Sequence, residues 1–275
     1  MSIVAYAPDD LTVAVTTDTT LGELQAQLAP RGQWLPVDPP HPERLTIKQI
    51  LDLNLSGPRR FGHGTIREHL LGIRAQLPDG RTIRNGGAVV KNAAGYDLCR
   101  LLTGARGELG AILEATFKVA PKPELERFLD ARFASLKAAV DFVEKVDTSA
   151  LLPVVLDLHW LNPGAEWIVV VGFAGDRETV EWQCAEVQRF GRLEESCLEH
   201  ENRFWVDGMA DMGVRKLSVL PSKLGETIES LGAGVTALLA RAGNGVIYYR
   251  GGPVPPEPQP SPLMRRLREA FQVQT

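Results

Sequence analysis

Residues 92–112 read NAAGYDLCRLLTGARGELGAI and place four glycines around a Tyr-Asp pair and a short apolar run. Glycine is favoured where the backbone turns through positive φ, or where another backbone or a ligand approaches closely. Such a dense cluster predicts either tight turns that pack two sheets together or a backbone that lies against a bound group. The segments on both sides of it bear on this choice.

The composition excludes several classes of protein. The chain has 275 residues, of which 44% are hydrophobic, enough for one large or two modest domains. A net charge of -4 and a pI of 5.8 argue against a sequence-independent nucleic-acid binder, which would need a basic face. Three scattered cysteines without a CxxC pair indicate a reducing cytoplasm. Because no window approaches the ~20 apolar residues of a membrane span, we expect membrane contact only through partners.

The segments around the glycine cluster predict a first domain over residues 1–121. Thr20 and Glu23 form a capping box that opens a helix, and Gly32 follows at its C-terminal end. The turn signal at 78–80 lies between two alternating runs and predicts a β-hairpin. The remaining predicted elements are a strand over 9–17, a helix over 46–54, a loop over 56–65, a helix over 96–104 and a strand over 109–121.

The pattern changes after residue 121. Over 122–252, strand-like and helix-like segments alternate without glycine-rich loops, which predicts an antiparallel sheet with helices on one side. Residues 253–275 then read as a proline-rich linker followed by an amphipathic helix. The expected fold class is α+β in two domains.

Three motifs in the first domain support a resemblance to a known family. They are SGPRRxG at Ser56–Gly62, KNxAGYDL at Lys91–Leu98 and GxLGxI at Gly107–Ile112. Together they resemble the PCMH-type FAD-binding domain of vanillyl-alcohol-oxidase-type flavoproteins and, more narrowly, the FAD-binding subunits of bacterial glycolate oxidases. The resemblance covers nearly the whole chain and is strongest over residues 1–121.

The resemblance implies a non-covalent FAD site in the first domain and a cap or substrate-type domain after it. Glycines would let the backbone approach the phosphates and rings of the dinucleotide. The residues expected to line the flavin are Pro39, Pro40, Thr46, Ser56, Gly57, Pro58, Gly62, Gly64, Thr65, Gly110 and Ile112.

The sequence also departs from the family pattern. The subdomain that carries the pyrophosphate loop in the family is expected to be missing, because Met1 falls after it. Lys48 and Gln49 stand where the family usually has Gly-Gly, and Asp18 stands where a glycine is common. Each change adds volume or negative charge near the expected ligand, although Lys48 could pair with a phosphate.

No catalytic or metal-binding set can be assigned. The five histidines are isolated in the sequence, and neither a histidine pair nor a nucleophile motif stands out. Asp97 is expected to cap the helix that follows it, and Tyr96 to be structural. Arg59 and Arg60 are expected on a solvated face, with phosphate or a partner's carboxylates as the alternative.

Two functions remain open. In the first, the chain is the FAD-binding subunit of a glycolate oxidase-like complex that oxidises a small 2-hydroxy acid, and it is accessory rather than catalytic. In the second, it has lost flavin and acts as a scaffold or interaction subunit. Both predict other subunits as partners, no nucleic acid and no direct membrane insertion. Bound flavin distinguishes the two.

Overall fold

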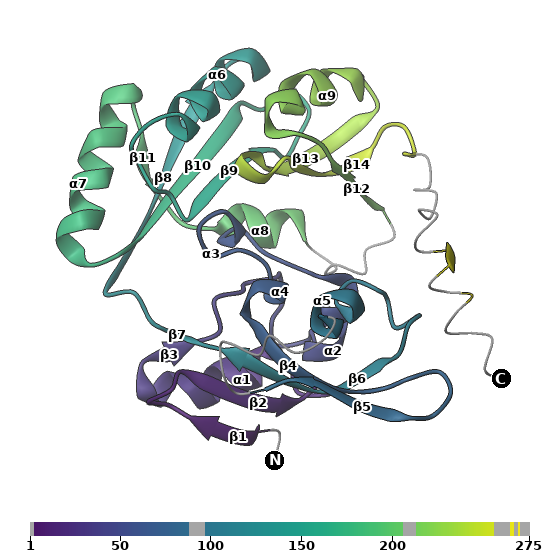
Figure 1. The fold of residues 1–275 in the computed structure, drawn as a ribbon. Coiled ribbons are helices and arrows are strands. Elements are labelled where there is room, and N and C mark those ends of the chain that lie inside the picture. Colours follow the sequence, from purple (N-terminus) through teal and green to yellow (C-terminus); the bar gives the residue numbers. More distant parts are fainter. Residues whose placement is uncertain (1–2, 88–96, 206–212, 256–264, 267–268, 270–275) are drawn as a thin grey trace. The chain divides into compact units, whose positions relative to one another are not determined.

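The computed structural model describes residues 3–87, 97–205, 213–255, 265–266 and 269 (Figure 1). These residues form two compact units. Unit 1 holds residues 3–57 and 64–122, and unit 2 holds 58–63 and 123–255. The KNxAGYDL motif and the expected C-terminal helix fall almost wholly outside the described residues. Of the helices that are described, none is long and apolar enough to span a membrane.

Unit 1 is built on an antiparallel sheet with the strand order β1-β2-β6-β4-β5. Its alternating strands bury one face, as Val13 and Val15 show. The predicted hairpin is confirmed as β4 and β5. The strands are β1 (Ile3–Ala7), β2 (Thr12–Thr16), β4 (Leu70–Gln76), β5 (Thr82–Gly86) and β6 (Ala111–Lys118), and a second small sheet pairs β3 (Gln33–Trp34) with β7 (Ala120–Pro121).

The helices of unit 1 begin where their capping residues predict. Thr20 and Glu23 form the expected capping box, and Gly32 adopts φ 63° after the helix. The side chain of Asp97 accepts a hydrogen bond from the Arg100 N–H, which confirms its capping role. The helices are α1 (Leu21–Leu28), α2 (Ile47–Leu53), α4 (Ile66–His69) and α5 (Leu98–Leu102).

Unit 2 contains an antiparallel sheet with the strand order β11-β8-β10-β9-β13-β14-β12. The α+β class predicted from the sequence is therefore confirmed. The strands are β8 (Leu125–Phe133), β9 (Val155–Trp160), β10 (Trp167–Gly175), β11 (Glu194–Ser196), β12 (Val214–Ser218), β13 (Val235–Arg241) and β14 (Val246–Gly251).

Helices cover both faces of this sheet, whereas the sequence predicted helices on one side. The larger core joins one face to α6 (Leu136–Asp147), α7 (Arg177–Val187) and α9 (Leu224–Ser230) (Figure 1). On the other face, Phe204 and Trp205 at the end of α8 (Glu199–Phe204) pack on Leu239 and Tyr248. The prediction missed the position of α8 because this short helix buries the ionisable residues His200 and Glu201 in place of an apolar stripe.

A second difference concerns the expected loop over 56–65. Residues Arg60–His63 form a single helical turn, α3, in unit 2. Arg59 just before it is not on a solvated face: its Nε lies 2.9 Å from Glu126 Oε1, and its guanidinium lies 5.3 Å from the Phe128 ring centroid. This ion pair joins the short segment to β8.

Candidate functional site

The residues predicted to line the flavin are packed against the chain itself. Pro39, Pro40, Ser56, Gly57 and Pro58 are all buried. A Cβ added to Gly57 would lie 1.7 Å from the carbonyl oxygen of Asp38, so segments 38–40 and 56–57 run against each other in unit 1. The glycine is thus required by a neighbouring backbone, whether or not a ligand is present.

Contacts within the chain or a positive φ also explain the other glycines predicted to line the flavin. The Gly62 N–H donates to the Val154 carbonyl at 3.1 Å. Gly110 has φ +145°, and a Cβ there would lie 2.8 Å from the carbonyl oxygen of Gln76. Gly64 has φ +81°, a conformation that favours glycine. Tight turns and backbone contacts therefore account for these positions.

Thr65 and Ile112 are also engaged within unit 1. Thr65 forms a capping box with Glu68 at the start of α4. The Ile112 carbonyl accepts a hydrogen bond from Thr17 Oγ1 at 2.7 Å. The role of all the predicted residues in binding FAD stays a prediction.

The N-terminus of α2 is the natural place to test for a pyrophosphate site, since free helix N–H groups bind phosphate. Here the Ile47 and Lys48 N–H groups donate to the Thr19 and Thr17 carbonyls at 2.8 and 2.7 Å. The Gln49 N–H donates to Thr46 Oγ1 at 3.2 Å. These amides are already satisfied, so they do not fit a pyrophosphate.

The amides at the start of α1 and the ammonium of Lys48 are also occupied by contacts within the chain. The Leu21 and Gly22 N–H groups at the start of α1 donate to the Leu45 and Pro42 carbonyls. The ammonium of Lys48, which could in principle meet a phosphate, is paired with Asp52. The N–H groups at the starts of these two helices are therefore not free to bind a phosphate.

One region of unit 1 holds buried polar atoms that have no hydrogen-bond partner. Asp52 Oδ1, Asn54 Oδ1 and Arg67 Nε are buried without a hydrogen-bond partner. They lie around the loop that follows α5: Arg67 Nη2 donates to the Thr103 carbonyl at 2.8 Å, and a Cβ on Gly104 would lie 3.5 Å from the Asn54 Cβ. Unsatisfied buried atoms are rare, and an absent ligand is one explanation for them. They include both a donor and acceptors, which fits the polar edge of a flavin ring.

Unit 2 contains a buried charged quartet, which we define as Asp157, His200, Glu201 and Arg241. Asp157 and Arg241 are register partners on β9 and β13, while the other two come from α8. Arg241 Nη1 contacts both Asp157 Oδ2 and Glu201 Oε1, and its Nη2 lies 2.9 Å from Glu201 Oε2. His200 Nε2 lies 3.3 Å from Asp157 Oδ2 and 3.4 Å from Glu201 Oε1.

The opposite charges of the quartet stabilise one another's ionised forms. Burial alone would lower the pKa of His200, but its hydrogen bonds to Asp157 and Glu201 outweigh burial and raise the pKa to about 9. Burial would raise the pKa of Glu201, but Arg241 and His200 hold it below its usual range. Two cations thus face two carboxylates inside unit 2, which satisfies charges that would be costly if unpaired.

The quartet also resembles a metal-binding set. Asp157, His200 and Glu201 can each place one ligand atom within 4.8 Å of the others. Arg241 Nη1, however, already bridges the two carboxylates. The guanidinium therefore supplies the positive charge that a metal ion would bring.

The prediction that the histidines are isolated is wrong for two of them. The rings of His159 and His200 stack with centroids 4.8 Å apart and an interplanar angle of 7°. The two residues are distant in sequence and meet because α8 packs across β9. The available signal was Asp157 and His159 two residues apart in the apolar run VVLDLHW, a spacing that puts both on one sheet face.

Comparison with known proteins finds similarity in the N-terminal part of the chain. A family model described as FAD binding domain matches residues 1–86. Over 143 residues the chain is 38% identical to glycolate oxidase subunit GlcE of Escherichia coli (strain K12), a match that covers 52% of this chain and 41% of that protein. It is 32% identical to glycolate oxidase subunit GlcD of Bacillus subtilis (strain 168) over 149 residues, covering 54% of this chain and 32% of that protein. The chain thus spans less than half the length of these relatives.

A solved structure extends the likeness to the whole fold. Alkyldihydroxyacetonephosphate synthase superposes with a TM-score of 0.72 over 99% of this chain and 63% of that one, at 17% sequence identity. At this identity the likeness concerns the fold alone. The FAD-linked oxidase fold predicted from the sequence is therefore confirmed.

Proposed function

Because residues 1–86 match a family model described as FAD binding domain, we propose that this chain is the FAD-binding subunit of a glycolate oxidase-like complex. The family match carries the proposal, and the similarity to a protein named as a glycolate oxidase subunit supports it. The complex would act in the cytoplasm on a small 2-hydroxy acid, with this chain accessory to a catalytic subunit.

The described residues indicate which part of FAD this chain would hold. Asn54 and Arg67, with the loop around Gly104, would meet the polar edge of the flavin ring, since they carry the unsatisfied buried atoms of unit 1. Pro39 and Pro40 would form an apolar wall, as the resemblance implies. The satisfied amides of α1 and α2 leave the pyrophosphate to groups outside these two helices. FAD would supply hydride-accepting chemistry to the complex, and this chain's part would be to bind and orient the flavin.

The test is a visible absorbance spectrum of the purified chain before and after excess FAD and desalting. Bands near ~370 and ~450 nm at about one flavin per chain would support the proposal. Titrations with FAD and with riboflavin then measure how much the pyrophosphate adds to binding, since α1 and α2 offer it no free amides. Arg67→Gln should weaken both, and Arg44→Gln, at a side chain 70% exposed in the same unit, should weaken neither.

A flavin-free scaffold is the second candidate, and one observation favours it. The glycines at 57, 62 and 110 are explained by contacts within the chain, so they do not need a ligand. A colourless protein that retains neither FAD nor riboflavin would overturn the flavin-binding proposal and leave the scaffold.

A further inference from the structure

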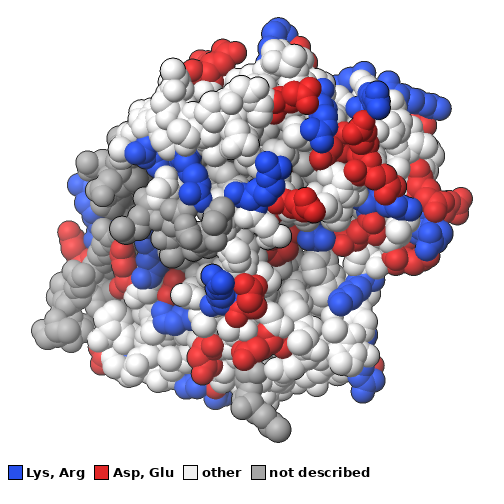
Figure 2. Space-filling view, turned by 180° about the vertical axis from the view of Figure 1, so that it is seen from behind, with Lys and Arg blue, Asp and Glu red and all other residues white. Residues whose placement is uncertain are grey.

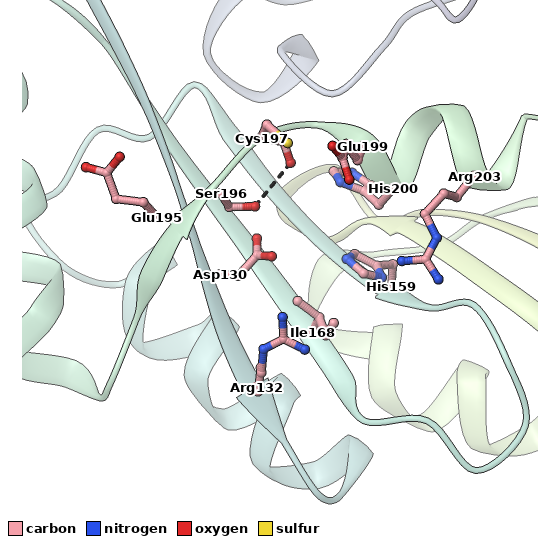
Figure 3. Close-up of a pocket in the computed structure, with 10 residues that line it drawn as sticks. All are labelled: Asp130, Arg132, His159, Ile168, Glu195, Ser196, Cys197, Glu199, His200 and Arg203. Carbon is pink, nitrogen blue, oxygen red and sulfur yellow. Dashed lines mark hydrogen bonds between the residues drawn. The ribbon is translucent and has the colours of Figure 1, made fainter.

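Two pockets of unit 2 differ in the charge of their linings. The pocket in Figure 3 is lined by acidic and basic side chains together, among them Asp130, Arg132 and Arg203, so it favours neither sign of charge. The other has a volume of about 270 Å³, and of the described residues that line it, some are acidic and none is basic. We call it the α6 pocket, because it lies between the C-terminal end of α6 and two short turns, Pro221–Lys223 and Ala242–Asn244.

One side of the α6 pocket is apolar and firmly packed. Val143 and Ala242 line it, and both are buried members of the larger core of unit 2. Its volume is slightly below the roughly 300–1,000 Å³ of pockets that hold drug-sized ligands. The apolar part of a ligand in this space is therefore small, such as a short alkyl chain.

Two carboxylates give the α6 pocket its negative charge. Glu144 and Asp147 both line it, and they are three residues apart on α6, so they are neighbours on one side of the helix. Neither forms an ion pair with another residue that the structure describes. Because α6 ends at Asp147, the negative end of the helix dipole also lies here. These groups together favour a cation.

The lysines next to the lining residues in sequence are engaged elsewhere. Lys145 Nζ lies 4.7 Å from the centroid of the Phe190 ring. Lys223 Nζ lies 2.6 Å from Glu226 Oε2. On the face of the molecule in Figure 2, acidic and basic side chains lie next to one another, so a lining with acidic groups alone is a local feature. The carboxylates of the α6 pocket are thus not neutralised by these two lysines.

We propose that the α6 pocket binds a small alkylammonium ion, with its alkyl chain on Val143 and Ala242 and its ammonium at Glu144 and Asp147. An ammonium carries three N–H donors and no acceptor, which matches a pair of carboxylates. Exposed ion pairs contribute little by themselves, so the burial of the alkyl chain supplies the rest of the affinity. The inference does not depend on flavin or on the proposed function.

Titration of the full chain, followed by amide NMR spectra, tests this inference. The probe is n-pentylammonium chloride, pentan-1-ol is its uncharged counterpart, and sodium pentanoate is the matching anion, all at constant ionic strength. We expect saturable shifts of the Thr148, Ala242 and Gly243 amide signals with pentylammonium. Pentanol should bind about tenfold more weakly, because it lacks the charge that the carboxylates and the helix dipole attract, and pentanoate should not bind.

Two variants and one control locate the site. The double variant Glu144→Gln, Asp147→Asn should weaken pentylammonium binding about tenfold and leave pentanol binding unchanged. Both positions are exposed, and the loss of acidic groups near a helix C-terminus does not destabilise the helix. Ser222→Trp, at an exposed lining position, should fill the pocket and weaken both ligands. Asp141→Asn, on the same helix but ion-paired with Lys137, should bind like the wild type.

Three results would overturn the inference. They are equal affinity for pentylammonium and pentanol, unchanged pentylammonium affinity in both pocket variants, and the lack of saturable shifts at the named amides with millimolar pentylammonium. Near-native circular dichroism of each variant, measured first, ensures that lost binding does not reflect lost folding.

Discussion

Replacing His200 tests the charged quartet, because the quartet makes the stability of unit 2 depend on pH. The ring is 4% exposed, and its contacts to Asp157 and Glu201 raise its pKa from 6.5 to about 9. A histidine with a raised folded pKa stabilises the fold fully below its unfolded pKa. That contribution is lost as the pH rises through the folded pKa. The loss should therefore fall between pH 6.5 and about 9.

The pKa shift of His200 sets the expected change in the free energy of unfolding. At about 1.4 kcal/mol per pKa unit, a rise from 6.5 to about 9 corresponds to about 3 kcal/mol of stability at low pH. Most of this, about 2 to 3 kcal/mol, should disappear between pH 6.5 and 9. His200→Gln should remove this pH dependence, because glutamine does not titrate.

Urea unfolding followed by tryptophan fluorescence at pH 6.5, 7.5, 8.5 and 9 measures the effect. Four of the five tryptophans lie in unit 2, and Trp205 Nε1 donates to Glu201 Oε2 at 3.1 Å, so the signal reports this region. The difference in free energy of unfolding between wild type and variant should shrink as the pH rises.

His159→Phe is the matched control. It removes the other buried histidine of the stack, whose pKa of about 3 keeps it neutral in the fold over this range. Its pH curve should run parallel to that of the wild type. If the wild-type and His200→Gln curves are parallel instead, His200 is not charged in the fold and the electrostatic reasoning is refuted.

Three further substitutions test single contacts through their urea midpoints. Arg241→Met should destabilise unit 2 by roughly 3–5 kcal/mol, because two buried carboxylates lose their guanidinium; a loss below about 1 kcal/mol would contradict the ion pairs. Thr46→Val removes the cap of α2 and should cost about 1 kcal/mol in unit 1, with a neutral result arguing against the capping box. Gly57→Ala should destabilise by at least about 1–3 kcal/mol, since its Cβ would lie 1.7 Å from the Asp38 carbonyl oxygen, and wild-type stability would show that the two segments do not touch.

Local chemistry made much of the fold predictable. The capping box at Thr20, the leucines of α1 and the hairpin turn at 78–80 each act within a few residues, so their sequence patterns are sufficient. The same holds for Asp97, whose side chain caps the helix that follows it. The face occupied by α8 was not predictable in this way, because it depends on contacts between distant segments.

The quartet escaped prediction for the same reason. Arg241 is 84 residues from Asp157 and 40 from Glu201, and strand pairing brings them together. A single sequence shows only that polar residues interrupt apolar strands. Such interruptions identify buried polar sites, yet they do not reveal which residues will become partners.

Lys48 and Gln49, where the resemblance leads us to expect Gly-Gly, bear on the question of the cofactor. Gln49 completes a capping box with Thr46, so the start of α2 is satisfied by side chains of this chain. Each non-glycine residue also favours a helix over glycine by up to about 1 kcal/mol. The pair therefore stabilises this short helix without a phosphate. Among the described residues, the starts of α1 and α2 are therefore satisfied within unit 1 and do not need a phosphate.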